Sequence, residues 1–315
     1  MSIIENALNK LGAKSEPVSE AIPSSPVVEP TPLVEQAAAK AKVEAAAAQA
    51  ASPRPAAPIM PHPAMDEQVS RQVHVDLAKL RARGLLTSDD ERSKVAEEYR
   101  LIKRPILANA FGPHPVRKGN MVMVTSSLPG EGKTFSTINL AISIAMELDR
   151  TVLLVDADVA KPRMPEYLGF RAEYGLLDIL RQGTQDLSSA ILRTNIDKLS
   201  ILPAGRTYVR ATELLASDAM YRLIDDLANR YPDRLVVFDS PPLLSTSEAS
   251  VLASHMGQIV MVVEADKTPQ TALRDALARI AGACDVVGLV LNKATGRHSG
   301  GYYGNYGYGG YAKQA

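Results

Sequence analysis

The sequence predicts an α/β fold built on one doubly wound, mostly parallel β-sheet. Short, continuous runs of Val, Ile and Leu recur along the 315-residue chain and alternate with stretches of helical periodicity. Strands that are apolar throughout are typical of parallel sheets covered by helices on both faces, and their connections are right-handed. The expected strands are residues 121–126, 151–156, 199–203, 234–239, 258–264 and 286–292, with helices such as 134–148 and 269–282 between them.

Composition excludes several classes of protein. The chain carries 35 Lys and Arg against 35 Asp and Glu, so it lacks the basic excess of a nucleic-acid-binding protein. Its single cysteine, Cys284, excludes a disulfide framework or a Cys-rich metal site. No apolar run reaches the roughly 18 residues of a membrane span, and the N-terminus does not have the layout of a secretory signal. We therefore expect a soluble, cytoplasmic protein.

The N-terminal quarter is expected to contain little fixed structure. Residues 1–11 form a short amphipathic helix in this interpretation, and both a frayed terminal helix and a docking helix for a partner remain open. Residues 12–65 hold 15 Ala and 10 of the 21 Pro. Such a segment buries too little apolar surface to offset its ordering entropy, so a disordered linker is predicted.

A globular domain is expected over residues 66–295. Its first two helices are predicted at 70–83 and 89–104. Ser88 or Asp89 would cap the second helix, and Pro105 would end it, because proline lacks the N–H that a helix interior requires.

A phosphate-binding loop follows the strand at 121–126. The segment Ser127-Leu-Pro-Gly-Glu-Gly-Lys-Thr134 stands between that strand and a helix, which is the context that a P-loop requires. Its glycines let backbone N–H groups turn towards phosphate oxygens, and the helix N-terminus favours the same anion. Lys133 would neutralise the phosphates and the Thr134 hydroxyl would ligate Mg²⁺. The expected nucleotide-binding residues are Pro129, Gly130, Glu131, Gly132, Lys133, Thr134, Phe135 and Asn292.

Carboxylates end two of the other predicted strands. The strand at 151–156 ends in Asp156, Asp158 stands two residues further on, and Asp239 ends the strand at 234–239. The carboxyl ends of parallel strands lie together, where ligands bind. We expect these carboxylates to hold magnesium directly or through water, and Asp156 or Asp158 to accept the proton of an attacking hydroxyl. Asn292 follows the last strand, where adenine recognition and a turn cap are both open interpretations.

The C-terminal residues 296–315 are predicted to be a flexible tail. Seven glycines lie between residues 296 and 310, a density that prevents regular structure. Five tyrosines share this segment, and their placement suits a substrate for modification as well as a merely adhesive tail. They are Tyr302, Tyr303, Tyr306, Tyr308 and Tyr311.

At these motifs the sequence resembles the bacterial tyrosine kinases, a P-loop family unrelated to eukaryotic protein kinases. The resemblance covers roughly residues 90–312 and includes TSSLPGEGKTFSTINLA, VLLVDADVAKPR, LVVFDSPP and the tyrosine cluster. Three further segments, DVAKPR, SPPLLSTSEAS and EEYRLIKRP, look most like the subgroup linked to exosortase-associated exopolysaccharide clusters. A P-loop NTPase type of sheet is implied.

The resemblance also implies roles. Lys133 and Thr134 would serve ATP and Mg²⁺, Asp156 and Asp158 catalysis and metal, and Asp239 the metal through water. The tail tyrosines would be phosphorylated in trans within a ring-shaped oligomer. The implied partners are a membrane-embedded polysaccharide co-polymerase, which activates the kinase and recruits it to the inner face of the membrane, and a tyrosine phosphatase.

Two departures from the family pattern concern charged residues. Ala160 stands where the family often has arginine after the second acidic residue. The oligomerisation motif Glu-x-x-Arg-x-x-Arg reads Glu97, Arg100 and Lys103, and lysine keeps the charge but loses the bidentate fork. A solvated charged helix face is the alternative interpretation of these three residues.

Two other functions remain open on the same fold. A partitioning or cell-division ATPase of the ParA and MinD type would need a second lysine five residues before Lys133, where Leu128 stands. A nucleotide-binding adaptor whose tail only binds partners fits the sequence as well. Transfer of phosphate from ATP to the tail would distinguish a kinase from both.

Overall fold

The computed structural model describes residues 71–90, 92–183, 187–231 and 233–294. The predicted helix at 1–11, the linker at 12–65 and the tail at 296–315 lie outside the described residues. Within the described ranges, no helix is both long and apolar enough to cross a membrane.

One eight-stranded sheet forms the centre of the fold, in the order β1-β4-β5-β3-β6-β2-β7-β8. All neighbouring strands are parallel except β4 and β5, which confirms the predicted mostly parallel α/β sheet. The strands are β1 (Gln72–Val73), β2 (Met121–Ser126), β3 (Thr151–Asp156), β4 (Leu192–Thr194), β5 (Leu199–Leu202), β6 (Arg234–Asp239), β7 (Gln258–Glu264) and β8 (Val287–Asn292).

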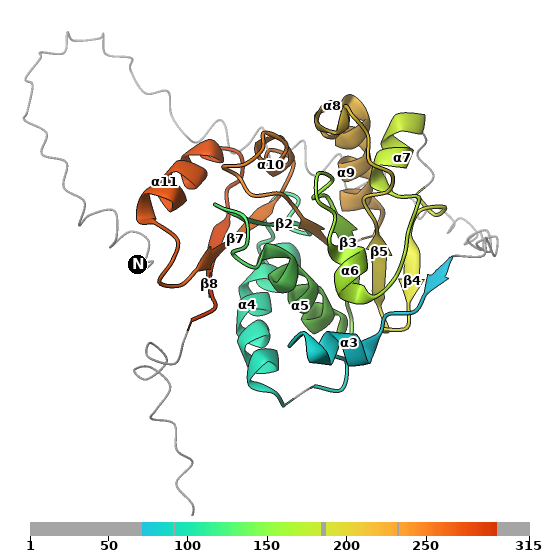
Figure 1. Ribbon diagram of the computed structural model, residues 1–315, viewed down its shortest axis with the longest axis vertical. Coiled ribbons are helices and arrows are strands. Elements are labelled where there is room, and N and C mark those ends of the chain that lie inside the picture. The colour runs from blue at the N-terminus through green and yellow to red at the C-terminus, as the bar shows by residue number, and fades with distance from the viewer. Residues whose placement is uncertain (1–70, 91, 184–186, 232, 295–315) are drawn as a thin grey trace, which may run out of the picture. The chain divides into compact units, whose positions relative to one another are not determined.

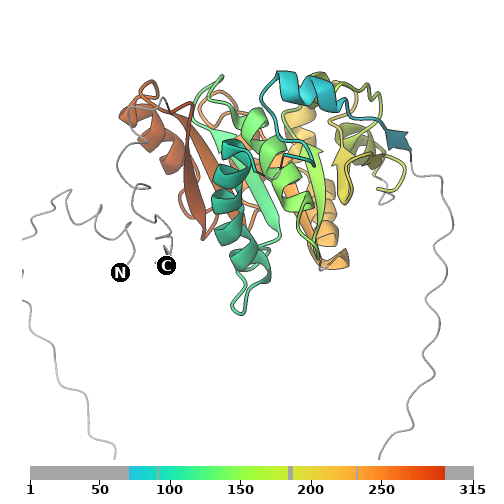
Figure 2. The same ribbon diagram turned by 90° about the horizontal axis from the view of Figure 1, so that it is seen from below.

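Helices cover both faces of this sheet (Figures 1 and 2). Side chains of α3 to α6 share one apolar core with strand residues such as Val122 and Val152. Side chains of α7 to α11 share the other core with Met123 and Leu153. The helices are α3 (Leu77–Ala82), α4 (Lys94–Phe111), α5 (Lys133–Ala145), α6 (Met164–Leu168), α7 (Leu176–Gln182), α8 (Ala211–Leu215), α9 (Asp218–Arg230), α10 (Glu248–Ala253) and α11 (Gln270–Arg279).

The first two predicted helices have different bounds from those expected. The stretch at 70–83 begins with strand β1, and α3 starts only after Asp76, whose side chain accepts a hydrogen bond from the Lys79 N–H at 3.0 Å. Helix α4 starts after Ser93, which caps the Ala96 N–H at 3.1 Å, rather than after Ser88 or Asp89.

The prediction that Pro105 ends the second helix is wrong. Helix α4 continues through Pro105 to Phe111. The carbonyl that Pro105 leaves without its helical partner belongs to Leu101, a residue on the exposed side of α4. Ile106, one residue further, is buried in the core, and this packing keeps the second half of the helix in place.

The strand order determines where the predicted site residues meet. Strand β6 lies between β3 and β2, and Asp156 at the end of β3 is the register partner of Asp239 at the end of β6. Asp239 is also aligned with Val124 in β2, just before the loop at 127–132. The carboxylates and the phosphate-binding loop therefore share one edge of the sheet.

Candidate functional site

The loop at residues 127–132 joins β2 to α5 with two glycines in left-handed conformation. Gly130 has φ of 88° and Gly132 has φ of 98°, a backbone region that residues with a Cβ seldom adopt. Helix α5 begins directly at Lys133, so its positive N-terminus faces the same space. The geometry is that of a phosphate cradle. Pro129 and Gly130 are exposed on the loop, whereas Phe135 is partly buried and packs against the apolar core that α3 to α6 share.

Lys133 forms an ion pair with Asp158 at the mouth of this loop. Both side chains are largely buried, and the Lys133 ammonium donates a hydrogen bond to the Asp158 Oδ2. Burial alone would lower the pKa of Lys133, but the charges of Asp239 and Asp158 outweigh it, and the pKa of Lys133 is raised. Lys133 is therefore positively charged, and its ammonium group is paired with the Asp158 carboxylate.

Two further carboxylates lie in the floor of the site. Asp156 and Asp239 are both fully buried. Among the described residues, neither carboxylate oxygen of Asp156 has a hydrogen-bond partner, and Oδ2 of Asp239 has none either. Burial, together with the charges of Asp239 and Asp158, raises the pKa of Asp156 well above its usual range. Burial also raises the pKa of Asp239 to about 6, although Lys133 opposes this effect.

The threonines of helix α5 face the same carboxylate. The Thr137 hydroxyl lies within hydrogen-bond distance of two acceptors, the Lys133 carbonyl at 2.8 Å and Asp239 Oδ1 at 3.2 Å. Thr134 lowers the pKa of Asp239. Buried carboxylate oxygens without partners beside a threonine hydroxyl are a donor set that suits a hard divalent cation. Within the part of the chain that the structure describes, no three His, Cys, Asp or Glu side chains are placed to hold a metal ion by themselves.

The end of β8 contacts the outside of the phosphate loop. Asn292 donates its side-chain amide hydrogen to the Glu131 carbonyl at 2.8 Å, and Lys293 Nζ donates to the Gly130 carbonyl at 2.7 Å. The amide of Asn292 thus contacts the loop backbone, and neither open interpretation of that residue included this contact. The Glu131 carboxylate accepts from the Leu128 N–H at 2.7 Å and from the Thr268 hydroxyl.

Sequence reasoning missed Thr268 and Lys293 as neighbours of the loop. Lys293 directly follows Asn292, so its position after the last strand was the available signal. Thr268 lies 137 residues from Glu131, and no motif marks it.

The predicted oligomerisation residues are not all exposed. Glu97 and Arg100 form an ion pair at 2.5 Å on the surface of α4. Lys103, in contrast, is buried: its ammonium donates to the Ser143 carbonyl at 2.6 Å and pairs with Glu147 at 2.7 Å. Lys103 therefore joins α4 to α5 within the chain, and its predicted role in oligomerisation stays a prediction.

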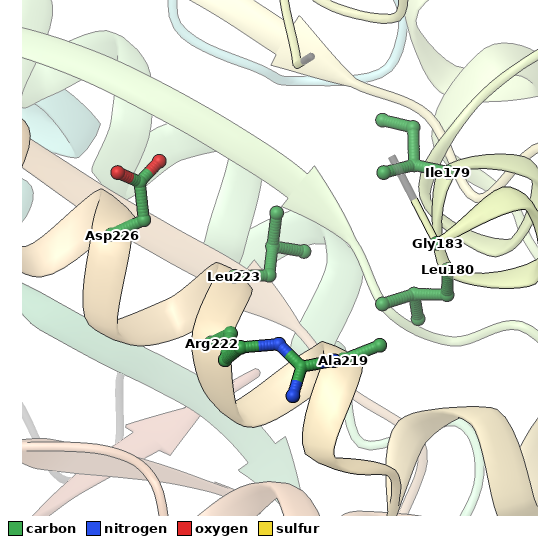
Figure 3. A pocket seen from close by; sticks show the side chains of 7 residues that line it. All are labelled: Ile179, Leu180, Gly183, Ala219, Arg222, Leu223 and Asp226. Atoms are coloured by element: carbon green, nitrogen blue, oxygen red, sulfur yellow. The ribbon is translucent and has the colours of Figure 1, made fainter. Parts of the chain in front are cut away.

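A small cavity of about 110 Å³ lies elsewhere, between α7 and α9. Figure 3 shows Ala219, Leu223 and Asp226 on one side of it and Ile179 and Leu180 on the other. None of the predicted site residues lines this cavity, and its volume is below that of typical small-molecule sites.

Comparison with known proteins places these motifs in a family. A family model described as an AAA domain matches residues 119–285, more than half of the chain. The tyrosine-protein kinase YwqD of Bacillus subtilis is 30% identical over 225 residues, which are 70% of this chain and 92% of YwqD.

Longer relatives match over part of their length. The putative tyrosine-protein kinase EpsB of Ralstonia solanacearum is 32% identical over 194 residues, which are 60% of this chain and 25% of EpsB. The tyrosine-protein kinase Wzc of Salmonella typhimurium is 33% identical over 191 residues, or 26% of its length. The chain thus spans about a quarter of the length of these two relatives.

Solved structures share the fold. The kinase domain of the Escherichia coli tyrosine kinase ETK superposes with a TM-score of 0.58 at 22% identity, covering 74% of this chain and 95% of that domain. The VpsO kinase domain gives a TM-score of 0.53 at 29% identity, covering 62% of this chain and 95% of that domain.

Proposed function

Because this chain belongs to the bacterial tyrosine-protein kinases, we propose that it transfers the terminal phosphoryl group of ATP to tyrosine hydroxyls. The first acceptors would be its own C-terminal tyrosines, Tyr302, Tyr303, Tyr306, Tyr308 and Tyr311. Acceptors and transfer site would belong to different subunits, so that the reaction proceeds in trans within an oligomer.

The observation that carries this proposal is the meeting of a phosphate loop and three aspartates at one edge of the sheet. Lys133 stands at the start of α5, and Asp156 and Asp239 are register partners on adjacent strands. Cationic and amide groups at such an edge stabilise charge on a transferring phosphoryl group. A buried carboxylate beside them supplies a base for a phenol.

In the proposed reaction the phenolic oxygen of a tail tyrosine bonds to the γ-phosphorus of ATP, and ADP leaves. The phenolic proton passes to the carboxylate of Asp156, whose raised pKa makes it a stronger base than an exposed aspartate. Lys133 turns from Asp158 to the β- and γ-phosphates. The backbone N–H groups of residues 130–134 hold the phosphate oxygens.

Magnesium would be held by Thr134, Asp158 and Asp239 together with phosphate oxygens of the nucleotide. When bound, it offsets negative charge on the phosphates. The unpartnered oxygen of buried Asp239 supports this assignment, since a buried polar atom without a partner is costly.

The partners belong to the same proposal. A membrane-embedded polysaccharide co-polymerase, the partner that the resemblance to the family implies, is proposed as activator. It would recruit the kinase from the cytoplasm to the inner face of the membrane. Exposed Glu97 and partly buried Arg100, which form an ion pair on α4, are proposed subunit contacts of a ring. A tyrosine phosphatase would reset the tail, and the polymer would be an exopolysaccharide of an exosortase-linked system.

The decisive experiment is incubation of the purified full chain with Mg²⁺ and γ-labelled ATP, with and without the cytoplasmic part of the co-polymerase, followed by mass-spectrometric mapping. We expect label on the tail tyrosines. Lys133→Met should bind the partner but lose the label, and a variant with all five tail tyrosines changed to Phe should transfer little.

Nucleotide binding without transfer, in the presence of the activator, would contradict the kinase proposal and favour the adaptor. Steady release of inorganic phosphate without labelled tyrosine would favour a ParA- or MinD-like ATPase. Mixing the Lys133→Met chain with the tyrosine-free chain tests transfer in trans, because only transfer between subunits can label the first.

A further inference from the structure

Asn292 and Lys293 at the end of β8 contact two consecutive carbonyl groups of the phosphate loop. We call this pair the β8 clamp. Asn292 donates to the Glu131 carbonyl at 2.8 Å and Lys293 to the Gly130 carbonyl at 2.7 Å. We propose that the β8 clamp positions the phosphate loop, by turning the N–H groups of Glu131 and Gly132 towards the phosphates.

The geometry of the peptide bond carries this inference. In a planar trans peptide, the C=O of one residue and the N–H of the next point in opposite directions. A donor that holds the Gly130 carbonyl therefore sets the direction of the Glu131 N–H, and a donor on the Glu131 carbonyl sets that of Gly132. The two donors are the last residue of β8 and the residue after it, so both N–H groups point to the opposite side of the loop.

These two N–H groups are available for a ligand. Among the residues that the structure describes, none accepts a hydrogen bond from the N–H of Glu131 or of Gly132. Gly130 and Gly132 both have positive φ, and successive N–H groups in such a backbone form a concave anion site. The clamp would thus fix a nest whose open side faces a phosphate.

Contacts with the end of β7 fix the position of the β8 clamp. Asn292 is the register partner of Glu264 on β7, and its carbonyl accepts from the Ala265 N–H at 2.9 Å. Lys293 Nζ also pairs with Glu264 Oε2 at 3.1 Å. Lys293 has φ of 57°, a strained conformation for a residue with a side chain, and such strain is retained where surrounding contacts fix it.

The β8 clamp packs so closely against the loop that no side chain fits at Gly132. A Cβ placed on Gly132 would lie 2.1 Å from Asn292 Nδ2. From the inside, the Glu131 carboxylate ties the start of the loop through the Leu128 N–H at 2.7 Å. The loop is thus fixed on both sides before any nucleotide arrives, which lowers the cost of ordering it on binding.

The inference rests on the proposed nucleotide site, and its test needs no tyrosine transfer. Pyrophosphate, which has neither base nor ribose, is the probe, measured by competition with a fluorescent ADP analogue. In Asn292→Ala and Lys293→Met we expect pyrophosphate and ADP to bind about tenfold more weakly. The reason is that each variant loses the hydrogen bond that orients one N–H group of the loop towards the phosphates. Lys293→Arg should restore most of the affinity, because it returns a donor.

Lys267→Met is the matched control. Lys267 also pairs with Glu264, at 3.2 Å, but contacts no loop carbonyl among the described residues, so its removal subtracts the same charge without loosening the loop. Amide hydrogen exchange gives a second readout: exchange at Glu131 and Gly132 should accelerate in the clamp variants and not in the control.

The proposal is overturned if pyrophosphate affinity is unchanged in both clamp variants, or if the control loses as much as Lys293→Met. The positioning role of Asn292 is also overturned if Asn292→Ala binds ADP more weakly but binds GDP and pyrophosphate as well as the unchanged protein does. That pattern would identify a contact between Asn292 and adenine. The Lys293 side chain is half-exposed, so we expect Lys293→Met to fold. This variant tests the proposal even if Asn292→Ala does not fold. A failed kinase assay with intact pyrophosphate binding would refute the proposed function alone.

Discussion

Lys133 and Asp158 form a buried ion pair across the mouth of the phosphate loop. The lysine that we propose as the phosphate ligand is therefore held by an acidic side chain of the same chain. In the proposed reaction a nucleotide replaces Asp158 as the partner of Lys133, and breaking the ion pair reduces the net free energy of nucleotide binding. The pair also keeps the lysine from being an uncompensated buried charge.

The first prediction concerns this exchange. Asp158→Asn should bind ADP more tightly in EDTA, by about fivefold, because the competing charge is gone and roughly 1 kcal/mol of hydrogen bonding no longer has to be broken. Tyrosine transfer with Mg²⁺ should fall sharply, since Asp158 is a proposed metal ligand. Isothermal titration measures the affinity. Asp225→Asn, on α9 away from the loop, is the control, and an unchanged or weaker affinity for ADP would refute the competition.

The second prediction concerns helix α4. Lys103→Met should lower the free energy of unfolding by about 1–3 kcal/mol, because the buried Ser143 carbonyl loses its donor. Arg100→Ala removes a surface ion pair and should change stability by about 1 kcal/mol or less. Urea titration of both variants provides the measurement.

The same two variants separate stability from assembly. In sedimentation velocity, Arg100→Ala should dissociate the oligomer while the chain remains folded. Loss of the oligomer in Lys103→Met at full stability would show that this lysine contacts a neighbouring subunit after all.

The sequence alone predicted those parts of the fold and of the site that depend on residues adjacent in the chain. Continuous apolar runs marked β2, β3, β6 and β7 to the residue, because a strand covered on both faces must be apolar throughout. The glycines and Lys133 of the loop are adjacent in sequence, so their joint role was visible. The parallel sheet then implied that Asp156 and Asp239 would meet.

Contacts between distant segments were not predictable in the same way. The helix through Pro105 depends on the burial of Ile106, which the sequence does not reveal. The burial of Lys103 depends on a carbonyl 40 residues away. The contact of Asn292 with the loop joins residues 161 apart, and only the strand order brings β8 close to the loop.

The third prediction concerns His255, at a cavity of about 380 Å³ remote from the loop. Burial lowers the pKa of His255 below 6.5, and the cation of Lys118 lowers it further. Arg117, Tyr221 and Asp225 line the same cavity, and Asp225 pairs with Lys118 at 3.2 Å.

With its folded pKa below the unfolded value, His255 binds fewer protons in the folded state. The stability that His255 contributes is therefore fully present above about pH 6.5 and is lost as the pH falls through its lowered folded pKa, with a slope under about 1.4 kcal/mol per pH unit. His255→Gln should flatten the change in urea midpoint between pH 7.5 and 5.5. An equal slope in both proteins would assign the effect to other groups.

The fourth prediction concerns the phosphorylated tail. Each phosphotyrosine adds about −1.5 to −2 charges, so a tail with several phosphates repels its neighbours and should no longer enter an adjacent site. The multiply phosphorylated chain should sediment as smaller species than the unphosphorylated chain, and more so at low salt, because salt screens this repulsion. A tail with one tyrosine, the other four being Phe, is the control and should remain assembled after phosphorylation. If the fully phosphorylated chain keeps the sedimentation coefficient of the unmodified oligomer at low salt, phosphorylation does not govern assembly and the tail serves another purpose.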